Sequence, residues 1–256
     1  MSLELSFSNS TRHYSEQELR LLKQVPKHIA VIMDGNRRWA RRGSNITKVM
    51  SALDGHWQGA HTLSSVVEAA SELGVSYLTM FAFSTENWKR SPHEVKTLMQ
   101  ILIEYLKRKR PSLIHEGVKF GVIGDISAFG SEVCDEIAKT VDATRGGQTM
   151  TLTLALNYGG RDEITRAAKA LANDYKSGNI DTISEKMFSR YLDTGHLPDP
   201  DLLIRTSGEM RISNFLLWQI AYAEVYITET LWPDFTPVEL FKAVLEYQNR
   251  DRRGGE

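Results

Sequence analysis

The sequence is poor in the features that mark several common classes of protein. Its 256 residues include one cysteine, Cys134, which excludes an intrachain disulfide and a thiolate metal cage. Its 31 basic and 32 acidic side chains leave a net charge of -1, so we expect no nucleic-acid partner. No apolar run approaches the ~20 residues needed to cross a bilayer, and Met1–Ser6 lacks a signal-peptide pattern. These absences predict a cytoplasmic protein.

The familiar short motifs of nucleotide-binding and hydrolytic enzymes are missing as well. The chain contains neither a Gly-x-x-x-x-Gly-Lys-Ser/Thr loop nor a Gly-x-Gly-x-x-Gly turn. It also lacks a Gly-x-Ser-x-Gly elbow, which weakens the case for a serine hydrolase. His56 and His61 are five residues apart, a poor spacing for a zinc pair on a helix. Any chemistry must therefore come from other polar clusters.

What the sequence does contain is a regular alternation of β-rich runs and helical patterns. The runs span 28–34, 76–84, 118–125, 150–158, 202–206 and 225–229. Helical periodicity covers 63–73, 131–144, 161–175 and 237–248, and a further helix starts at Pro92 and ends in the basic run before Pro111. No repeat or linker divides the chain. The pattern predicts one α/β domain with a mainly parallel six-stranded sheet flanked by helices on both faces.

The first polar cluster, Met33-Asp34-Gly35-Asn36-Arg37-Arg38-Trp39, directly follows the first apolar run. Ligands in such folds lie outside the carboxyl ends of the strands. Asp34 offers oxygen atoms to Mg²⁺, Gly35 allows close backbone approach, and Arg38 can form paired hydrogen bonds to an oxyanion. The alternative is an Asp-Gly turn before a solvated basic helix.

Two further clusters follow later runs. Phe83-Ser84-Thr85-Glu86-Asn87-Trp88-Lys89-Arg90 precedes the helix start Ser91-Pro92, so Trp88 could instead simply pack under that helix. Arg205 and Arg211 flank a Ser-Gly turn and suit a second anionic group, although a surface ion pair is the alternative. Together the three clusters predict a site for two anions.

In order along the chain, these clusters resemble the motifs of the cis-prenyltransferases. The matching segments are Met33-Asp34-Gly35-Asn36-x-Arg38-Trp39, Gly55-His56, Phe83-Ser84-Thr85-Glu86-Asn87-Trp88-x-Arg90, Arg205-Thr206-Ser207-Gly208-Glu209, Arg211–Gln219 and Ala221-Tyr222-Ala223-Glu224. The likeness runs from about Pro26 to Gly255 and is strongest to bacterial members that make undecaprenyl diphosphate. It implies a catalytic domain over 26–256, preceded by an arm over 1–25, and an apolar product tunnel framed by helices.

The resemblance also implies roles for individual residues. Enzymes of this family condense isopentenyl diphosphate repeatedly onto an allylic diphosphate such as farnesyl diphosphate. Asp34 would bind Mg²⁺ and assist proton removal, and Asn87 would take part in proton transfer, which we interpret as positioning because an amide is a feeble base. Glu224 matches a second metal carboxylate. The implied substrate-binding residues are Gly35, Asn36, Arg37, Arg38, Trp39, His56, Ser84, Thr85, Glu86, Trp88, Arg90, Arg205, Arg211, Ile212 and Ser213.

Further expectations concern assembly and product. The family resemblance implies a homodimer, in which Glu224 and the Arg253-Gly254-Gly255 tail reach toward the partner, and a lipid product that allows peripheral contact with a membrane. Ala82, where short-chain members tend to carry a bulky residue, predicts a long product, undecaprenyl diphosphate for cell-wall synthesis. Alternatives are a short- or medium-chain synthase, a non-catalytic accessory subunit and an unrelated phosphate-binding enzyme such as a phosphatase.

The sequence departs from the family pattern at four places. The segment between Trp39 and Gly55 is longer than usual, and Ala52 stands where an arginine is common, so Lys48 or Arg42 would have to substitute. Met210 replaces a frequent histidine near the metal, and thioether sulfur is a poor Mg²⁺ ligand. Arg37 replaces a common glycine.

Overall fold

A single twisted sheet organises the chain. The computed structural model describes residues 12–42 and 48–251, with side chains for all of these except 48–52. Its strands are β1 (His28–Ile32), β2 (Tyr77–Ser84), β3 (Val118–Ile123), β4 (Met150–Tyr158), β5 (Leu202–Arg205) and β6 (Glu224–Ile227). They form a six-stranded sheet in the order β3-β4-β2-β1-β5-β6, with every pair parallel. The predicted α/β class and strand number are confirmed.

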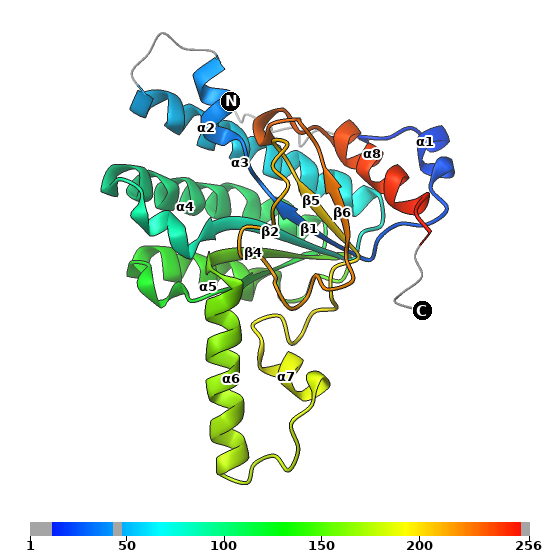
Figure 1. Cartoon of the computed structure of the whole chain (residues 1–256). Coiled ribbons are helices and arrows are strands. Elements are labelled where there is room, and N and C mark those ends of the chain that lie inside the picture. Colours follow the sequence, from blue (N-terminus) through cyan, green and yellow to red (C-terminus); the bar gives the residue numbers. More distant parts are fainter. Residues whose placement is uncertain (1–11, 43–47, 252–256) are drawn as a thin grey trace, which may run out of the picture.

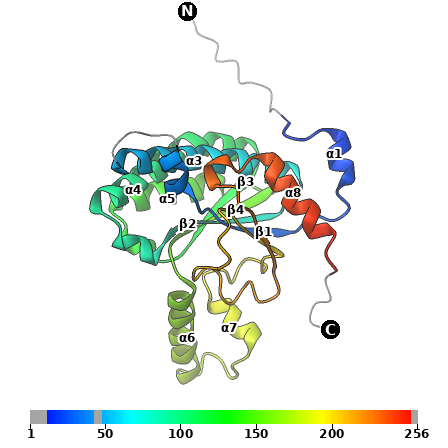
Figure 2. The same cartoon turned by 45° about the horizontal axis from the view of Figure 1, so that its top comes forward.

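The larger core lies on the helix-rich face of the sheet. The helices α3 (Lys48–Glu72), α4 (Pro92–His115), α5 (Ser131–Thr144) and α8 (Pro237–Gln248) cover this face (Figures 1 and 2). Their apolar side chains pack with alternate residues of β1, β2 and β4 in one buried cluster. Burial of this cluster supplies most of the hydrophobic stabilisation, at ~25 cal/mol per Å² of apolar surface.

The opposite face is covered differently. A smaller cluster joins Ile32, Tyr158, Phe215 and Leu216, so the chain after β5 folds back under the sheet. Helices α6 (Gly160–Lys176) and α7 (Glu185–Tyr191) lie on this side, and α6 projects away from the sheet (Figure 1). Both faces therefore carry helices, as predicted, but loop residues supply the packing directly beneath β1 and β4.

The basic run in α4 is not at the end of the helix, and that detail of the sequence analysis was wrong. The helix continues past Pro111 to His115. The basic side chains instead form ion pairs with acidic residues: Lys109 Nζ lies 3.2 Å from Glu68, and Arg110 contacts Glu136 on α5. Packing against two neighbouring helices stabilises the last turn, so the proline does not terminate it.

The described part of the amino-terminal arm, from residue 12, contains a short helix and contacts the rest of the domain. Helix α1 (Glu16–Leu21) begins with a capping box between Ser15 and Glu18. The buried Tyr14 donates from its hydroxyl to the Pro237 carbonyl at 2.8 Å, and the His13 backbone N–H donates to Glu72 at 2.8 Å. These contacts hold residues 12–21 against α3 and α8. The boundary at residue 25 remains a prediction.

Helix α2 (Asn36–Arg42) corresponds to the basic helix that was the alternative interpretation of the first polar cluster, whereas helix α7 and the early start of α3 were not predicted. None of the described helices is both long and apolar enough to span a membrane.

Candidate functional site

The three polar clusters meet at one edge of the sheet. Asp34 follows β1, the short helix η1 (Thr85–Lys89) follows β2, and the segment 206–214 follows β5. These three strands are adjacent, in the order β2-β1-β5. Their carboxyl ends therefore bring the clusters together, as the strand-end rule predicts.

The centre of the site is an ion pair between Asp34 and Arg205. The Arg205 side chain is 4% exposed, and its Nη2 donates to Asp34 Oδ2 at 2.7 Å. Its Nη1 donates to Ser213 Oγ at 2.7 Å and to the Arg211 carbonyl. Its buried Nε finds no partner among the described residues. A buried guanidinium with a spare donor is suited to an anionic ligand.

The backbone around Asp34 is fixed by close contacts. Its N–H donates to Thr206 Oγ1 at 2.9 Å, and its carbonyl accepts from the Trp232 N–H at 2.9 Å. Gly35 follows with φ of +109°, and a Cβ there would lie 2.9 Å from Leu231. Only glycine meets both demands, so the turn that begins α2 is rigidly placed.

Glu94, on the first turn of α4, lies close to three basic side chains beside the polar site. Its Oε1 accepts from Arg90 Nη1 at 3.0 Å, and lies 3.3 Å from His56 Nε2 and 4.0 Å from Arg37 Nε. Burial lowers the pKa of His56, although the hydrogen bond to Glu94 opposes this shift. The lowered pKa favours the neutral imidazole of His56, which can donate one hydrogen bond and accept another.

Helix η1 contributes Glu86 and Asn87 to the same space. Asn87 Oδ1 accepts from the Ser84 backbone N–H at 3.1 Å, which orients the amide. Trp88 Nε1 donates to Asn157 Oδ1 at 2.8 Å, and its ring packs against Phe83. Glu86 lies beside Asn214, whose amide donates to Glu86 Oε1 at 3.2 Å.

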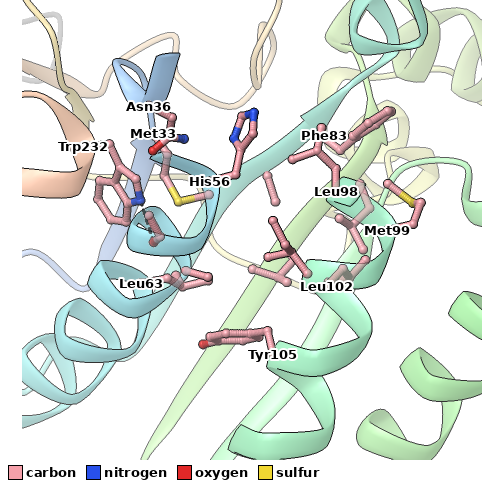
Figure 3. Close-up of a pocket in the computed structure, with 16 residues that line it drawn as sticks. Met33, Asn36, His56, Leu63, Phe83, Leu98, Met99, Leu102, Tyr105 and Trp232 are labelled. Carbon is pink, nitrogen blue, oxygen red and sulfur yellow. Dashed lines mark hydrogen bonds between the residues drawn. The ribbon is translucent and has the colours of Figure 1, made fainter. Parts of the chain in front are cut away.

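These residues enclose a polar pocket that opens into an apolar one. The polar pocket, with a cavity volume of about 570 Å³, is lined by Asp34, Asn36, His56, Ser84, Glu86, Asn87, Arg90, Arg205, Ser213 and Asn214 with a few apolar residues. The apolar pocket lies between α3, α4 and the sheet and holds about 100 Å³ (Figure 3). Met33, Asn36, His56, Ala82 and Leu98 line both. The geometry suits a molecule with an anionic head and a hydrocarbon tail.

Known proteins share this architecture and its sequence. The family model described as "Putative undecaprenyl diphosphate synthase" matches residues 32–255. The chain belongs to this family. It is 48% identical to an isoprenyl transferase of Chlamydia muridarum over the whole of both chains. It is 46% identical to the isoprenyl transferase of Clostridium perfringens over 97% of each. The resemblance seen in the sequence is confirmed, and the protein belongs to a family of prenyl-transferring enzymes.

Solved structures of the family confirm the fold. A lavandulyl diphosphate synthase from Lavandula x intermedia, in complex with dimethylallyl diphosphate, superimposes with a TM-score of 0.86 at 36% identity. The match covers 91% of this chain and 99% of that one. A probable undecaprenyl diphosphate synthase from Campylobacter jejuni superimposes with a TM-score of 0.75 at 34% identity. That match covers 92% of this chain and 100% of the other.

Not every predicted site residue lines the pockets. Gly35, Arg37, Arg38, Thr85, Trp88, Arg211 and Ile212 surround the polar pocket without lining it. Arg38 bonds to Ser207 and lies 3.4 Å from Glu209, while Trp39 donates to Asp234 at 2.7 Å. Trp39 therefore braces α2 against η3 (Trp232–Asp234), away from the pocket wall. Met210 is 86% exposed.

Glu224 lies away from Asp34 within one chain. It is the first residue of β6 and pairs with Leu202, whereas the site lies beyond Arg205 and Ile227 at the other end of these strands. Its carboxylate binds Arg250 Nη1 at 2.8 Å. A shared metal would thus need a second copy of the chain. Residues 43–47, the side chains of Lys48 and Ala52, and the 253–255 tail lie outside the described residues.

The donor set fits a magnesium ion shared with a substrate but not a protein-enclosed metal. Among the described residues no three His, Cys, Asp or Glu side chains form a metal-binding group. Mg²⁺ usually takes one or two carboxylates and completes its shell with water and phosphate. Asp34 is one-third exposed at the pocket, and the buried Asn36 Oδ1 has no described partner. Both are hard oxygen ligands of the kind Mg²⁺ prefers.

Two residues of the site were missed from the sequence. Glu94 could have been found, because Ser91-Pro92-x-Glu94 is a helix-start pattern beside Arg90. Asn214 lies within the matching segment Arg211–Gln219 but was given no role, and its bond to Glu86 spans 128 positions. No local pattern predicts such a contact.

Proposed function

We propose that this chain condenses isopentenyl diphosphate with an allylic diphosphate, which we assign as farnesyl diphosphate, and repeats the reaction to make a long cis-polyprenyl diphosphate. In each cycle the allylic C–O bond breaks, diphosphate leaves, a C–C bond forms to isopentenyl C4, and C2 loses a proton. The observation that carries the proposal is the junction of the polar and apolar pockets, which share five lining residues.

The two diphosphates would occupy different parts of the polar pocket. Arg205, Arg211 and Ser213 are assigned to isopentenyl diphosphate, because Arg205 is buried with a spare Nε donor and already binds Ser213. The backbone from Gly35 to Arg38, with His56 and Arg90, is assigned to the allylic diphosphate. Of these residues, Asn36, His56 and Arg90 line the polar pocket together with Asp34.

Asp34 and Asn36 would hold Mg²⁺ together with substrate phosphate oxygens. The ion would supply charge stabilisation to the departing diphosphate. Arg205 Nη2 donates to Asp34 Oδ2, so Asp34 Oδ1 would serve the ion and the spare Arg205 Nε would serve the isopentenyl diphosphate. Asn87, with its amide fixed by Ser84, would orient a diphosphate oxygen or water toward the proton that is lost.

A homodimer is part of this proposal. Glu224 is 28% exposed at the sheet edge strand β6, next to the exposed Tyr222 and Val225, and this surface could meet a second copy. The long hydrocarbon product would bring the enzyme into contact with a membrane surface. Oligomeric state by light scattering tests the first point directly.

One assay tests the function. Purified protein is incubated with labelled isopentenyl diphosphate, farnesyl diphosphate and Mg²⁺, and products are separated by chromatography. Label in a prenyl product supports the proposal. Phosphate release from simple monoesters without condensation would favour a phosphatase, and no activity without a second protein would favour an accessory subunit.

Ala82 gives a prediction about product length. It lines both pockets, so a growing chain must pass it. Changing Ala82 to leucine should shorten the product, because overfilling a packed space costs about 1–3 kcal/mol. Chromatographic chain length is the measurement. Ala128→Leu, on an exposed turn outside both pockets, is the matched control. An unchanged length in Ala82→Leu would contradict the role.

A short- or medium-chain product is the second candidate, and Tyr105 favours it. This residue is 7% exposed and lies at the end of the apolar pocket away from Asn36 and His56 (Figure 3). Its ring lines the space into which a long product would grow. A wild-type product that stops one or two isoprene units beyond the three-unit farnesyl starter would support this candidate, and a product near eleven units would support the first.

A further inference from the structure

Asn214 joins three elements of the site through one side chain and one carbonyl. Its Oδ1 accepts from the Arg161 backbone N–H at 2.9 Å, and its carbonyl accepts from the Gly160 N–H at 2.7 Å. Both donors belong to the first turn of α6. Its Nδ2 donates to Glu86 Oε1 on η1 at 3.2 Å. A single residue thus connects the loop after β5, the start of α6 and the segment after β2.

The junction is crowded and its backbone is specialised. Asn214 has φ of +63°, in the left-handed region that asparagine and aspartate tolerate better than most residues. A Cβ at Gly159 would lie 2.8 Å from Asn214 Nδ2 and 2.9 Å from Thr85 Oγ1. The position of the Asn214 amide is therefore set by α6 and by close packing, and the hydrogen bond to Glu86 then fixes η1 relative to it.

This bond lies in the wall of the polar pocket. Glu86 and Asn214 both line it, and their chain neighbours Asn87 and Ser213 do as well. Ser213 is bound to Arg205, and Asn87 is oriented by Ser84. The two loops come from strands β2 and β5, which are separated by β1. No other described hydrogen bond joins η1 to the loop that carries Ser213.

We propose that Asn214 is a positioning residue that locks Asn87 and Ser213 into one arrangement through its hydrogen bond to Glu86. The inference rests on the proposed prenyl transfer and assigns a specific source of order within that site. When the bond is present, isopentenyl diphosphate meets both loops already in place. When it is lost, each loop must be ordered by the substrate itself, which weakens binding.

Glu86 is ionised and therefore can only accept in this bond. Burial would raise the pKa of Glu86, but hydrogen bonds from its own backbone and from Ser84, Asn214 and Thr85 together lower it. The donor must then come from residue 214. Because residue 214 donates and residue 86 accepts, a pair of substitutions can exchange the donor and the acceptor of this bond.

The test is the pair of variants Asn214→Asp and Glu86→Gln/Asn214→Asp. Aspartate keeps the acceptor for the start of α6 and tolerates the left-handed backbone, so the fold should be preserved. It replaces the donor by a second carboxylate facing Glu86. We expect the KM for isopentenyl diphosphate to rise about tenfold, with a smaller change for the allylic substrate. In the double variant the amide introduced at position 86 can donate to the carboxylate introduced at position 214.

The result is read as two ratios. The first is the KM for isopentenyl diphosphate of Asn214→Asp divided by that of the wild type, which should be about ten. The second is the same KM of the double variant divided by that of the single variant Glu86→Gln, which should be near one. Equal ratios in both backgrounds, or a thermal midpoint that falls several degrees with Asn214→Asp, would overturn the proposal in favour of simple helix capping. A wild-type protein that makes no prenyl diphosphate at all would instead refute the proposed function.

Discussion

Changing Asp34 to alanine is expected to lower kcat by at least about a thousandfold, a loss of more than about 4 kcal/mol in transition-state stabilisation. Asp34 is the carboxylate at the centre of the polar pocket, one-third exposed and fixed through its backbone to Thr206 and Trp232. Its proposed task, to hold Mg²⁺ as charge develops on the departing diphosphate, matters most in the transition state. Binding of substrates should therefore change less than turnover.

The control for this prediction separates charge from packing. Alanine leaves the buried Arg205 without its 2.7 Å partner, which is itself destabilising. Asparagine keeps an oxygen for Arg205 but carries no charge, so it should preserve the fold and still lose turnover. Steady-state rates and circular dichroism are measured on both. Near wild-type rates in a folded variant would show that the assignment of Asp34 is wrong.

Most of the sheet could be predicted from the sequence because its strands are locally recognisable. Residues 150–158 form one run of mostly apolar and β-branched residues and become β4 with the same bounds. The bounds predicted for the final helix, 237–248, are also those of the structure. Pro237 fits the first turn of a helix, and the apolar period continues to Tyr247. Prediction failed where tertiary contacts matter: α4 continues through Pro111, and Leu113 beyond the proline is buried in the main core.

The candidate site was predictable in its parts but not in its connections. The strand-end rule placed Asp34, Asn87 and Arg205 at one edge. The sequence could not indicate that Arg205 binds Asp34 directly, that Glu94 gathers His56 and Arg90, or that Asn214 reaches Glu86, since these contacts join distant segments. Glu224 shows the opposite case: the motif assigns it to the metal, and only β6 register reveals that it lies at the far end of the sheet.

Changing Arg205 to alanine should raise the KM for isopentenyl diphosphate by about a hundredfold, with a much smaller effect on the allylic substrate. A hydrogen bond to a charged group is worth about 1.5–3 kcal/mol, and each 1.4 kcal/mol is tenfold. Arg205 is 4% exposed, so its guanidinium would act in a site from which water is largely excluded. The same change also frees Ser213 from its 2.7 Å contact.

Arg211 provides the internal comparison. It is assigned to the same diphosphate but does not line the polar pocket, and its side chain is 59% exposed and paired with Glu209, so solvent screens its charge. Arg211→Ala should therefore raise the same KM by only a few-fold. Arg205→Lys keeps a charge without the planar fork that serves Asp34 and Ser213 together, and it should fall between the two. Separate KM determinations for the two substrates decide: equal increases for both after Arg205→Ala would mean that this buried guanidinium organises the whole pocket through Asp34 instead of binding one diphosphate.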